Sequence, residues 1–262
     1  MPRVAFAGTV PLAHETIGSG FPWVFLHGFP LARRLWSPQR IAGHGQRVFV
    51  DLRGFGDSPT APTATTDEMA RDVLAAMSAL GHETFGVVGH SLGGYVAFGL
   101  HRQAPGRVAA LALVDTQARP DTPEAAAKRL DLAAKVERDG TLAAEEAFLG
   151  KMLAPANRGG PSLEQVRDVM RGNKPAGLAA ALRGMAERPD ARPQLAAVRC
   201  PTLVVVGEHD ELTPLDLAEE MANGITGARL VVIPHAGHVP NLENAPAFED
   251  AFRSLARRLA EG

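Results

Sequence analysis

The chain has 262 residues, of which 45% are hydrophobic and 21% are charged, and its formal net charge at pH 7 is −2. This composition is typical of a globular protein with one large domain, or with a domain that carries an insertion. Without a run rich in Lys and Arg, the sequence predicts neither nucleic-acid binding nor attraction to an anionic membrane.

Cysteine usage and the distribution of apolar residues narrow the class of protein further. A single cysteine, Cys200, excludes an intramolecular disulfide and argues against a cysteine-based metal cluster. No apolar stretch approaches the roughly 20 residues that cross a bilayer. The first ten residues lack the basic and apolar pattern of a signal peptide. We therefore expect a cytoplasmic protein without membrane insertion.

Short apolar runs rich in Val, Leu and Phe predict buried strands. They lie at residues 23–26, 48–50, 85–88, 108–114, 203–206 and 230–233. Continuous apolar runs of this length are typical of a parallel sheet that is covered on both faces. Residues 3–7 and 10–17 could form an antiparallel hairpin at one edge of that sheet.

Helical patterns alternate with these strands at residues 67–80, 92–104 and 246–260, which predicts a doubly wound α/β fold. The alternation breaks between about residues 116 and 193, where four amphipathic helices are expected. Their ranges are 123–138, 141–153, 162–171 and 176–187. We therefore expect residues 1–115 and 194–262 to form the core, and residues 116–193 to form a helical cap over the carboxyl edge of the sheet.

The first chemical motif is Gly89-His90-Ser91-Leu92-Gly93, which follows a predicted strand and precedes a predicted helix. It matches G-x-S-x-G, in which the glycines permit a strained turn that holds the serine out at the top of the sheet. The setting favours Ser91 as a catalytic nucleophile over a residue in an ordinary tight turn.

A second motif, His27-Gly28-Phe29-Pro30, follows the strand predicted at residues 23–26. An acyl-transfer enzyme stabilises the oxyanion of its tetrahedral intermediate, and backbone amides do this without reorganising. The amide of Leu92, directly after the nucleophile, would be one donor, and the amide of Phe29 would be the second. Taken alone, this motif fits a plain strand-to-loop turn equally well.

Two further motifs follow the last two predicted strands. The segment at residues 207–214 contains three competing acids, Glu208, Asp210 and Glu211. The segment at residues 235–238 contains His235 and His238. An acid at the end of a strand can fix the tautomer of a histidine that serves the serine as a base. The chain order serine, acid, histidine is the order that this kind of fold uses.

Other polar residues have structural interpretations. His27 and His90 flank the expected site and are predicted to make structural hydrogen bonds. The run from Asp51 to Ser58 is predicted to brace a loop. The nine histidines include no H-E-x-x-H and no paired metal-ligand spacing, so we expect no metal.

Together, HGFP, DLRGFGDSP, GHSLGG, GEHDELTP and AGH-x4-E, in this order and spacing, resemble the α/β-hydrolase superfamily over nearly the whole chain. The nearest branch is similar to esterases, 3-oxoadipate enol-lactonases and cofactor-free haloperoxidases. The resemblance implies a triad of Ser91, Asp210 and His238, an oxyanion hole of the Phe29 and Leu92 amides, and no cofactor. Glu243-Asn244-Ala245-Pro246 departs from the E-x-P that the family often has.

The resemblance implies a serine hydrolase that cleaves carboxylic esters of small to medium size through an acyl-enzyme. Lactone hydrolysis and C–C bond hydrolysis are alternatives in the same class. A ligand receptor without catalysis is the alternative of another class, since one fold hosts many functions. The expected partner is a small ester or lactone, and the sequence leaves the oligomeric state open.

Three structural expectations can be tested directly. The acid is expected to be Asp210, because of its G-x-x-D-x-x-T-P context, although Asp115 also lies at a strand end. The Phe29-Pro30 peptide is expected to be cis. The cap is expected to close a mostly apolar cavity, into which one or two of six side chains reach. These six are Leu149, Met152, Leu153, Leu178, Leu182 and Met185.

Overall fold

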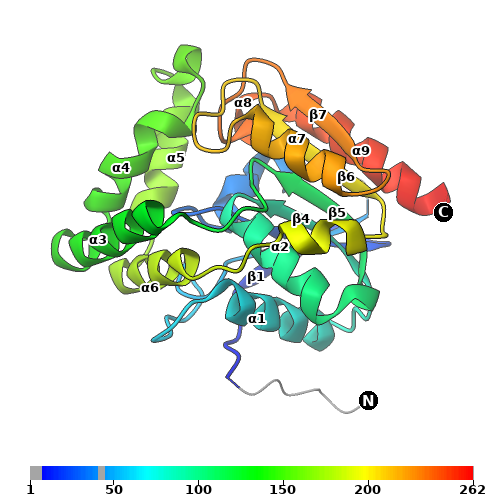
Figure 1. Cartoon of the computed structure of the whole chain (residues 1–262), viewed down its shortest axis with the longest axis horizontal. Helices are drawn as coiled ribbons and strands as arrows, with labels where there is room; N and C mark the ends of the chain where they lie inside the picture. Colours follow the sequence, from blue (N-terminus) through cyan, green and yellow to red (C-terminus); the bar gives the residue numbers. More distant parts are fainter. Residues whose placement is uncertain (1–7, 41–44, 262) are drawn as a thin grey trace.

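The computed structural model describes residues 8–40 and 45–261. Seven strands form one sheet in the order β1-β3-β2-β4-β5-β6-β7 (Figure 1). The strands are β1 (His14–Ile17), β2 (Pro22–Leu26), β3 (Gln46–Val50), β4 (Phe85–His90), β5 (Val108–Val114), β6 (Thr202–Gly207) and β7 (Arg229–Ile233). Only β1 runs antiparallel to its neighbour, and the other pairs are parallel. The predicted doubly wound, mostly parallel sheet is confirmed.

Alternation along the strands builds a hydrophobic core on each face of the sheet. In β2, Val24 and Leu26 pack into one core, while Trp23 and Phe25 pack into the other. Successive side chains of a strand point to opposite faces, so a run that is apolar throughout needs cover on both sides. This is why the central strands carry no polar alternation.

Helices supply that cover. The first core receives side chains of α1 (Thr66–Ala79), α2 (Leu92–Gln103) and α7 (Leu215–Gly224). The second receives those of the 3-10 segment η1 (Arg33–Arg40) and of α9 (Ala245–Glu261), which follows the short α8 (Pro240–Glu243). Three more 3-10 segments are η2 (Pro105–Arg107), η3 (Pro155–Asn157) and η4 (Arg192–Ala197). Each helix that the sequence predicts is observed with its ends within two residues of the predicted ones, whereas α7 and α8 were not predicted.

Four helices lie between β5 and β6, as the sequence predicts: α3 (Pro123–Asp139), α4 (Leu142–Met152), α5 (Pro161–Arg171) and α6 (Pro175–Ala186). They stand together at the left of Figure 1, to one side of the sheet. We refer to α3–α6 as the inserted helices. Among them α3 packs most extensively on α6.

Glycines bring α6 onto the core. A Cβ atom at Gly177 would lie 1.8 Å from the carbonyl oxygen of Gly54, and one at Gly184 would lie 2.0 Å from that of Ala64. The two glycines are seven residues apart, which places them on one face of the helix. Backbone of α6 therefore touches backbone of the segment that follows β3.

The predicted edge hairpin is only partly represented. Residues 3–7 lie outside the described residues. The strand expected at residues 10–17 is shorter, because β1 begins at His14 and pairs with β3. The Val10 amide instead donates to Asp72 Oδ1 at 2.9 Å, so this end of the segment is bound to α1.

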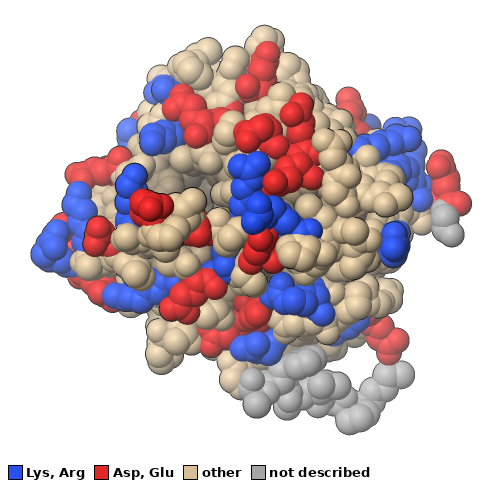
Figure 2. Space-filling model, in the orientation of Figure 1, with Lys and Arg blue, Asp and Glu red and all other residues tan. Residues whose placement is uncertain are grey.

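Lys and Arg are interspersed with Asp and Glu over the face of the molecule that Figure 2 shows. Among residues 8–40 and 45–261, no helix is long and apolar enough to span a bilayer.

Candidate active site

Ser91 occupies a strained turn between β4 and α2. Its φ is 51° and its ψ is −112°, a region that residues with a Cβ rarely adopt. The Ser91 amide donates to the Val114 carbonyl at 2.9 Å, and its own carbonyl accepts from Thr116 Oγ1 at 2.8 Å. These bonds to β5 and the segment after it hold the turn that the motif predicts.

The flanking glycines are required by close contacts within this turn. A Cβ at Gly89 would lie 2.5 Å from the carbonyl oxygen of Gly93, and a Cβ at Gly93 would lie 2.3 Å from that of Leu26. Both obstacles are backbone atoms, which cannot move aside as a flexible side chain can. The G-x-S-x-G spacing therefore follows from the packing of α2 against β4 and β2.

The loop after β2 lies against Ser91. Strands β2 and β4 are hydrogen-bonded neighbours, with Leu26 opposite Gly89. A Cβ at Gly28 would come within 2.9 Å of Ser91 Cβ, so the HGFP loop contacts the serine directly. The Phe29-Pro30 peptide is cis, which confirms the prediction. The amides of Phe29 and Leu92 are thus carried by two segments that meet at Ser91.

His238 pairs with Asp210 out of contact with solvent. His238 Nδ1 lies 2.9 Å from Asp210 Oδ2, and both side chains are buried. Thr213 Oγ1 donates to the same carboxylate oxygen at 2.5 Å, and the Leu212 amide donates to Asp210 Oδ1 at 2.8 Å. Of the acids left open by the sequence, Asp210 is the one that this structure pairs with His238.

These contacts determine the charge of Asp210. Burial alone would raise its pKa, but the charge of His238 and the hydrogen bonds from His238, Thr213 and Leu212 outweigh burial and hold the pKa below its usual range. Asp210 is therefore an anion at neutral pH. When His238 is neutral, an anion there favours the tautomer with the proton on Nδ1, which leaves Nε2 as an acceptor.

Asp115, the alternative acid, lies beside this pair without replacing it. One oxygen of each carboxyl and a ring nitrogen of His238 lie within 4.8 Å of one another. Asp115 Oδ1 accepts from the Gly207 amide at 2.8 Å. Burial, together with the charge of Asp210, raises the pKa of Asp115 well above its usual range, which favours its protonated form.

His27 and His90 have the structural hydrogen bonds that the sequence predicts. His27 Nε2 accepts from the Leu52 amide at 3.0 Å. His90 Nε2 lies 2.6 Å from the His238 carbonyl, to which it donates. Burial, and then the neighbouring charge of His238, lower the pKa of His90 to about 3. A buried neutral imidazole thus supports the loop that carries His238.

The run from Asp51 to Ser58 braces its loop, as predicted. Asp51 accepts from the Arg33 amide at 2.7 Å and from the Asp57 amide at 2.9 Å. Ser58 Oγ donates to the Asp51 carbonyl at 2.7 Å. These hydrogen bonds hold the segment after β3 in place, which is a structural role.

Glu243 links the inserted helices to the histidine loop. Its carboxylate accepts from the Gly237 amide at 2.6 Å and from the Ala154 amide at 2.8 Å. Asn157, in η3, donates to it as well, at 2.8 Å. The sequence shows Glu243 only as part of AGH-x4-E, and this bridging role requires knowledge of which segment lies opposite.

Ser91 and His238 line one cavity of about 80 Å³. The other lining residues are Phe29, Tyr95, Gln117, Arg129, Phe148, Met185, Leu212 and Thr213. Of the six apolar side chains proposed to reach it, only Met185 does, within the expected one or two. Half of the lining residues are polar, so the expectation of a mostly apolar cavity was wrong. Arg129 and Gln117 were missed, because isolated polar residues of a helical segment are more often solvated.

Within residues 8–40 and 45–261, two groups of side chains are close enough to share a metal ion: Asp115, Asp210 and His238, and the exposed Glu208, His209 and His235. The first group is engaged in the hydrogen bonds described above. In the second, Glu208 accepts from the His235 amide at 2.9 Å. The sequence spacing did not reveal either group, and the expectation of no metal stays a prediction.

A model of the alpha/beta hydrolase fold family matches residues 22–245, which include every segment of this site. The chain belongs to this family. This alpha/beta hydrolase is 34% identical over 256 residues to a pimeloyl-[acyl-carrier protein] methyl ester esterase of Chromobacterium violaceum, a match that covers 94% of this chain and 96% of the relative.

Solved structures agree with that assignment. A thermophilic esterase from Thermogutta terrifontis, solved with malate bound, superposes with a TM-score of 0.94 at 38% identity, covering 98% of this chain and 97% of the other. The enol-lactonase of Burkholderia xenovorans gives a TM-score of 0.85 at 27% identity, covering 93% and 95%. This alpha/beta hydrolase therefore has esterase-type relatives in both sequence and structure.

Proposed function

We propose that this alpha/beta hydrolase is a carboxylesterase that cleaves small to medium esters through an acyl-enzyme. Ser91 is the nucleophile, His238 the general base, and Asp210 the acid that orients it. The observation that carries the proposal is the buried pair of His238 and Asp210 at 2.9 Å, whose histidine lines the same cavity as a serine on a strained turn.

The chemistry follows from these positions. His238 takes the hydroxyl proton of Ser91 as the oxygen attacks the ester carbonyl. The Phe29 and Leu92 amides donate to the oxyanion. His238 then gives its proton to the leaving alcohol, and a water molecule repeats the sequence to release the acid. Every step uses residues of this chain, and none requires a cofactor.

We also propose that the inserted helices act as a cap, with residues 1–115 and 194–262 as the core. The support is that three residues of α3, α4 and α6 line the cavity of Ser91: Arg129, Phe148 and Met185. Lactone hydrolysis is the second candidate, favoured by the similarity to an enol-lactonase, since a lactone is an internal ester open to the same attack. A cytoplasmic location stays a prediction.

Release of p-nitrophenol from short-chain esters tests the proposal. Ser91→Ala is expected to lower turnover by a factor on the order of a million, and a phosphonate ester should label Ser91 covalently. Ser254→Ala, which removes a hydroxyl on α9 that bonds only to the Ala251 carbonyl, serves as the control. Labelling at another serine, or full activity of Ser91→Ala, refutes the assignment. A ligand that binds without turnover in the native chain indicates a receptor.

A further inference from the structure

The cavity of Ser91 contains one positively charged side chain, that of Arg129 on α3. The side chain is only 20% exposed, so its charge lies largely within the wall of the cavity. A cation in a small hollow is costly unless an anion neutralises it or a ligand supplies one. The charges around Arg129 therefore decide which substrates can enter.

One carboxylate serves two guanidinium groups here. Asp121 Oδ2 accepts from Arg129 Nε at 2.5 Å, and Asp121 Oδ1 accepts from Arg188 Nη1 at 2.5 Å. Asp121 and Arg188 are both buried, at 4% and 3% exposure. Two positive charges thus share a single negative charge beside the cavity, which leaves one positive charge in excess.

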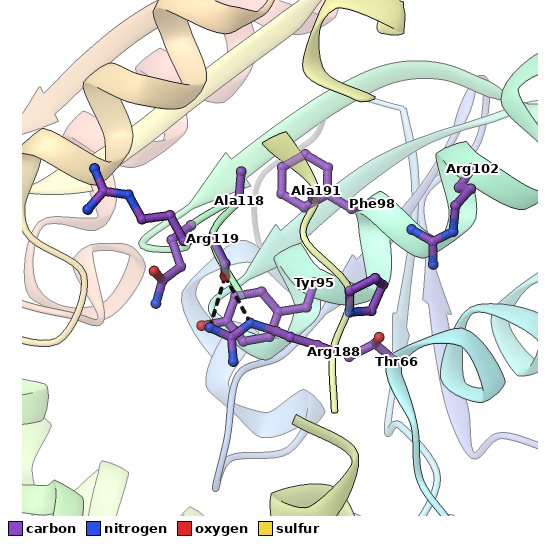
Figure 3. A pocket seen from close by; sticks show the side chains of 10 residues that line it. Thr66, Tyr95, Phe98, Arg102, Ala118, Arg119, Arg188 and Ala191 are labelled. Carbon is purple, nitrogen blue, oxygen red and sulfur yellow. Dashed lines mark hydrogen bonds between the residues drawn. The ribbon is translucent and has the colours of Figure 1, made fainter. Parts of the chain in front are cut away.

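Arg188 has a structural role. Its Nε and Nη2 donate to the Arg119 carbonyl at 3.2 and 3.0 Å (Figure 3). Its guanidinium lies over the ring of Tyr95, 4.4 Å from the centroid. Tyr95 also lines the Ser91 cavity. Arg188 therefore holds Asp121 and Tyr95 in place and adds positive potential behind the ring.

Arg129 retains donors that structure does not use. A guanidinium has five N–H donors, and Arg129 gives Nε and one Nη2 hydrogen to Asp121. Its Nη1 contacts the sulfur of Met185 at 3.7 Å, and sulfur is a weak acceptor. Among residues 8–40 and 45–261, Arg129 Nη1 makes no hydrogen bond to an oxygen. Gln117 lines the same cavity and adds a neutral amide.

We propose that the preferred substrates are esters that carry a carboxylate besides the ester group, such as half-esters of short dicarboxylic acids. Arg129 Nη1 binds that carboxylate while Ser91 attacks the ester carbonyl. The proposal rests on the ester hydrolysis proposed above and specifies its substrate class. A cavity of about 80 Å³ limits the chain between the two groups to a few carbons.

The test compares monomethyl and dimethyl esters of succinate, glutarate and adipate at pH 7, where the free carboxyl is ionised. Wild-type protein is expected to prefer the half-ester in kcat/KM. Arg129→Gln should lower the ratio of half-ester to diester by about ten- to hundredfold, mainly through KM, because a hydrogen bond to a charged group is lost. Arg129→Lys should keep part of the preference. A wild-type ratio of one or below overturns the proposal, whatever the variants do.

Arg183→Gln is the matched control, because Arg183 on α6 pairs with Glu137 of α3 at 2.7 Å and both side chains are about half exposed. It removes an ion pair of the inserted helices outside the cavity lining and should keep the ratio. If Arg129 only ties the helices together, its variants lose activity on both esters equally, which contradicts the proposal.

Binding separates this inference from the proposed catalysis. Calorimetry with glutarate needs no turnover. Wild-type binding that weakens at least about tenfold in Arg129→Gln supports the carboxylate site, even if neither ester is hydrolysed. An absence of hydrolysis would then contradict only the proposed esterase activity. Equal binding by both proteins, or none to wild type at millimolar glutarate, overturns the site and leaves the esterase proposal standing.

Discussion

Burial raises the pKa of both carboxyl groups near His238, and their charged neighbours and hydrogen bonds then decide which of the two is the anion. Asp210 receives donors at both oxygens and is held as an anion. Asp115 Oδ1 receives the Gly207 amide, while Oδ2 has no hydrogen-bond partner in the described structure. A nearby carboxylate raises the pKa of a second carboxyl, so Asp210 can orient the histidine as an anion while the protonated form of Asp115 is favoured.

Asparagine substitutions separate these two residues. Asp210→Asn removes the anion that fixes the His238 tautomer and should lower kcat by about 10,000-fold. Asp115→Asn puts an amide of similar shape where the protonated carboxyl is favoured, and it should change kcat/KM by less than about tenfold. Steady-state kinetics on one p-nitrophenyl ester measures both. If Asp115→Asn is the more damaging change, the roles of the two residues must be exchanged.

His90 makes stability depend on pH. Its pKa is about 3 in the folded chain, against an ordinary value of 6.5. Between these values the unfolded chain binds a proton that the folded chain does not, so the free energy of unfolding falls as pH falls below 6.5, by about 1.4 kcal/mol per pH unit. From pH 7 to pH 5 this loss amounts to about 2 kcal/mol.

His90→Gln should remove that contribution while keeping a donor for the His238 carbonyl. Urea unfolding at pH 7 and pH 5 measures the difference, and other titrating groups cancel when the two proteins are compared. Equal pH dependence of the variant and the native chain would mean that the pKa of His90 is the same in the folded and the unfolded chain, which contradicts this prediction.

At the scale of elements, the seating of α6 decides the shape of the cavity. Gly177 and Gly184 place its backbone against the segment after β3, and Met185, the next residue, lines the cavity. Glu243 makes a second connection, because its carboxylate accepts hydrogen bonds from both Ala154 and Gly237. These are two of the contacts that join the inserted segment to the core.

Alanine at Gly184 tests this seating. A Cβ 2.0 Å from the Ala64 carbonyl oxygen should force α6 outward, with a loss of about 1–3 kcal/mol in unfolding free energy and weaker ester hydrolysis. Gly150→Ala on α4, where a Cβ meets nothing within 4 Å, should instead stabilise by about 0.5–1 kcal/mol. Thermal denaturation compares the two variants. Equal melting temperatures would show that α6 adapts freely.

At the scale of the whole molecule, core and inserted helices together bound the space for the acyl chain. Each buried methylene is worth about 0.8 kcal/mol until the cavity of about 80 Å³ is full. Activity on p-nitrophenyl esters should therefore peak at short or medium acyl chains. Long-chain triglycerides should be poor substrates for the same reason.

Truncation of Met185 to Ala should shift this peak to longer chains, because Met185 lines the cavity. The same change at Met152, which is buried in α4 without lining it, should not. A profile that rises steadily toward long-chain lipids, or one that Met152→Ala shifts equally, contradicts this account of the cavity.

The sequence by itself determined the parallel sheet, most of the helices between its strands, the insertion and the five segments of the site. Apolar runs and glycine-bounded motifs can be recognised from a short stretch of sequence. The turn at Ser91, for example, needs glycine at positions 89 and 93, where a Cβ would meet backbone atoms. The pairing of His238 with Asp210 also followed, through a resemblance that spans most of the chain.

Only the tertiary structure decided the raised pKa of Asp115, the bridge at Glu243 and the presence of Arg129 in the cavity. Each depends on a residue far away in the chain: Arg129 shares Asp121 with Arg188, and Asp115 faces Asp210. The charge of a group depends on its burial and its neighbours. Burial and neighbours are set only when separate elements pack. Polar residues that the sequence predicts to be solvated can therefore become part of the site.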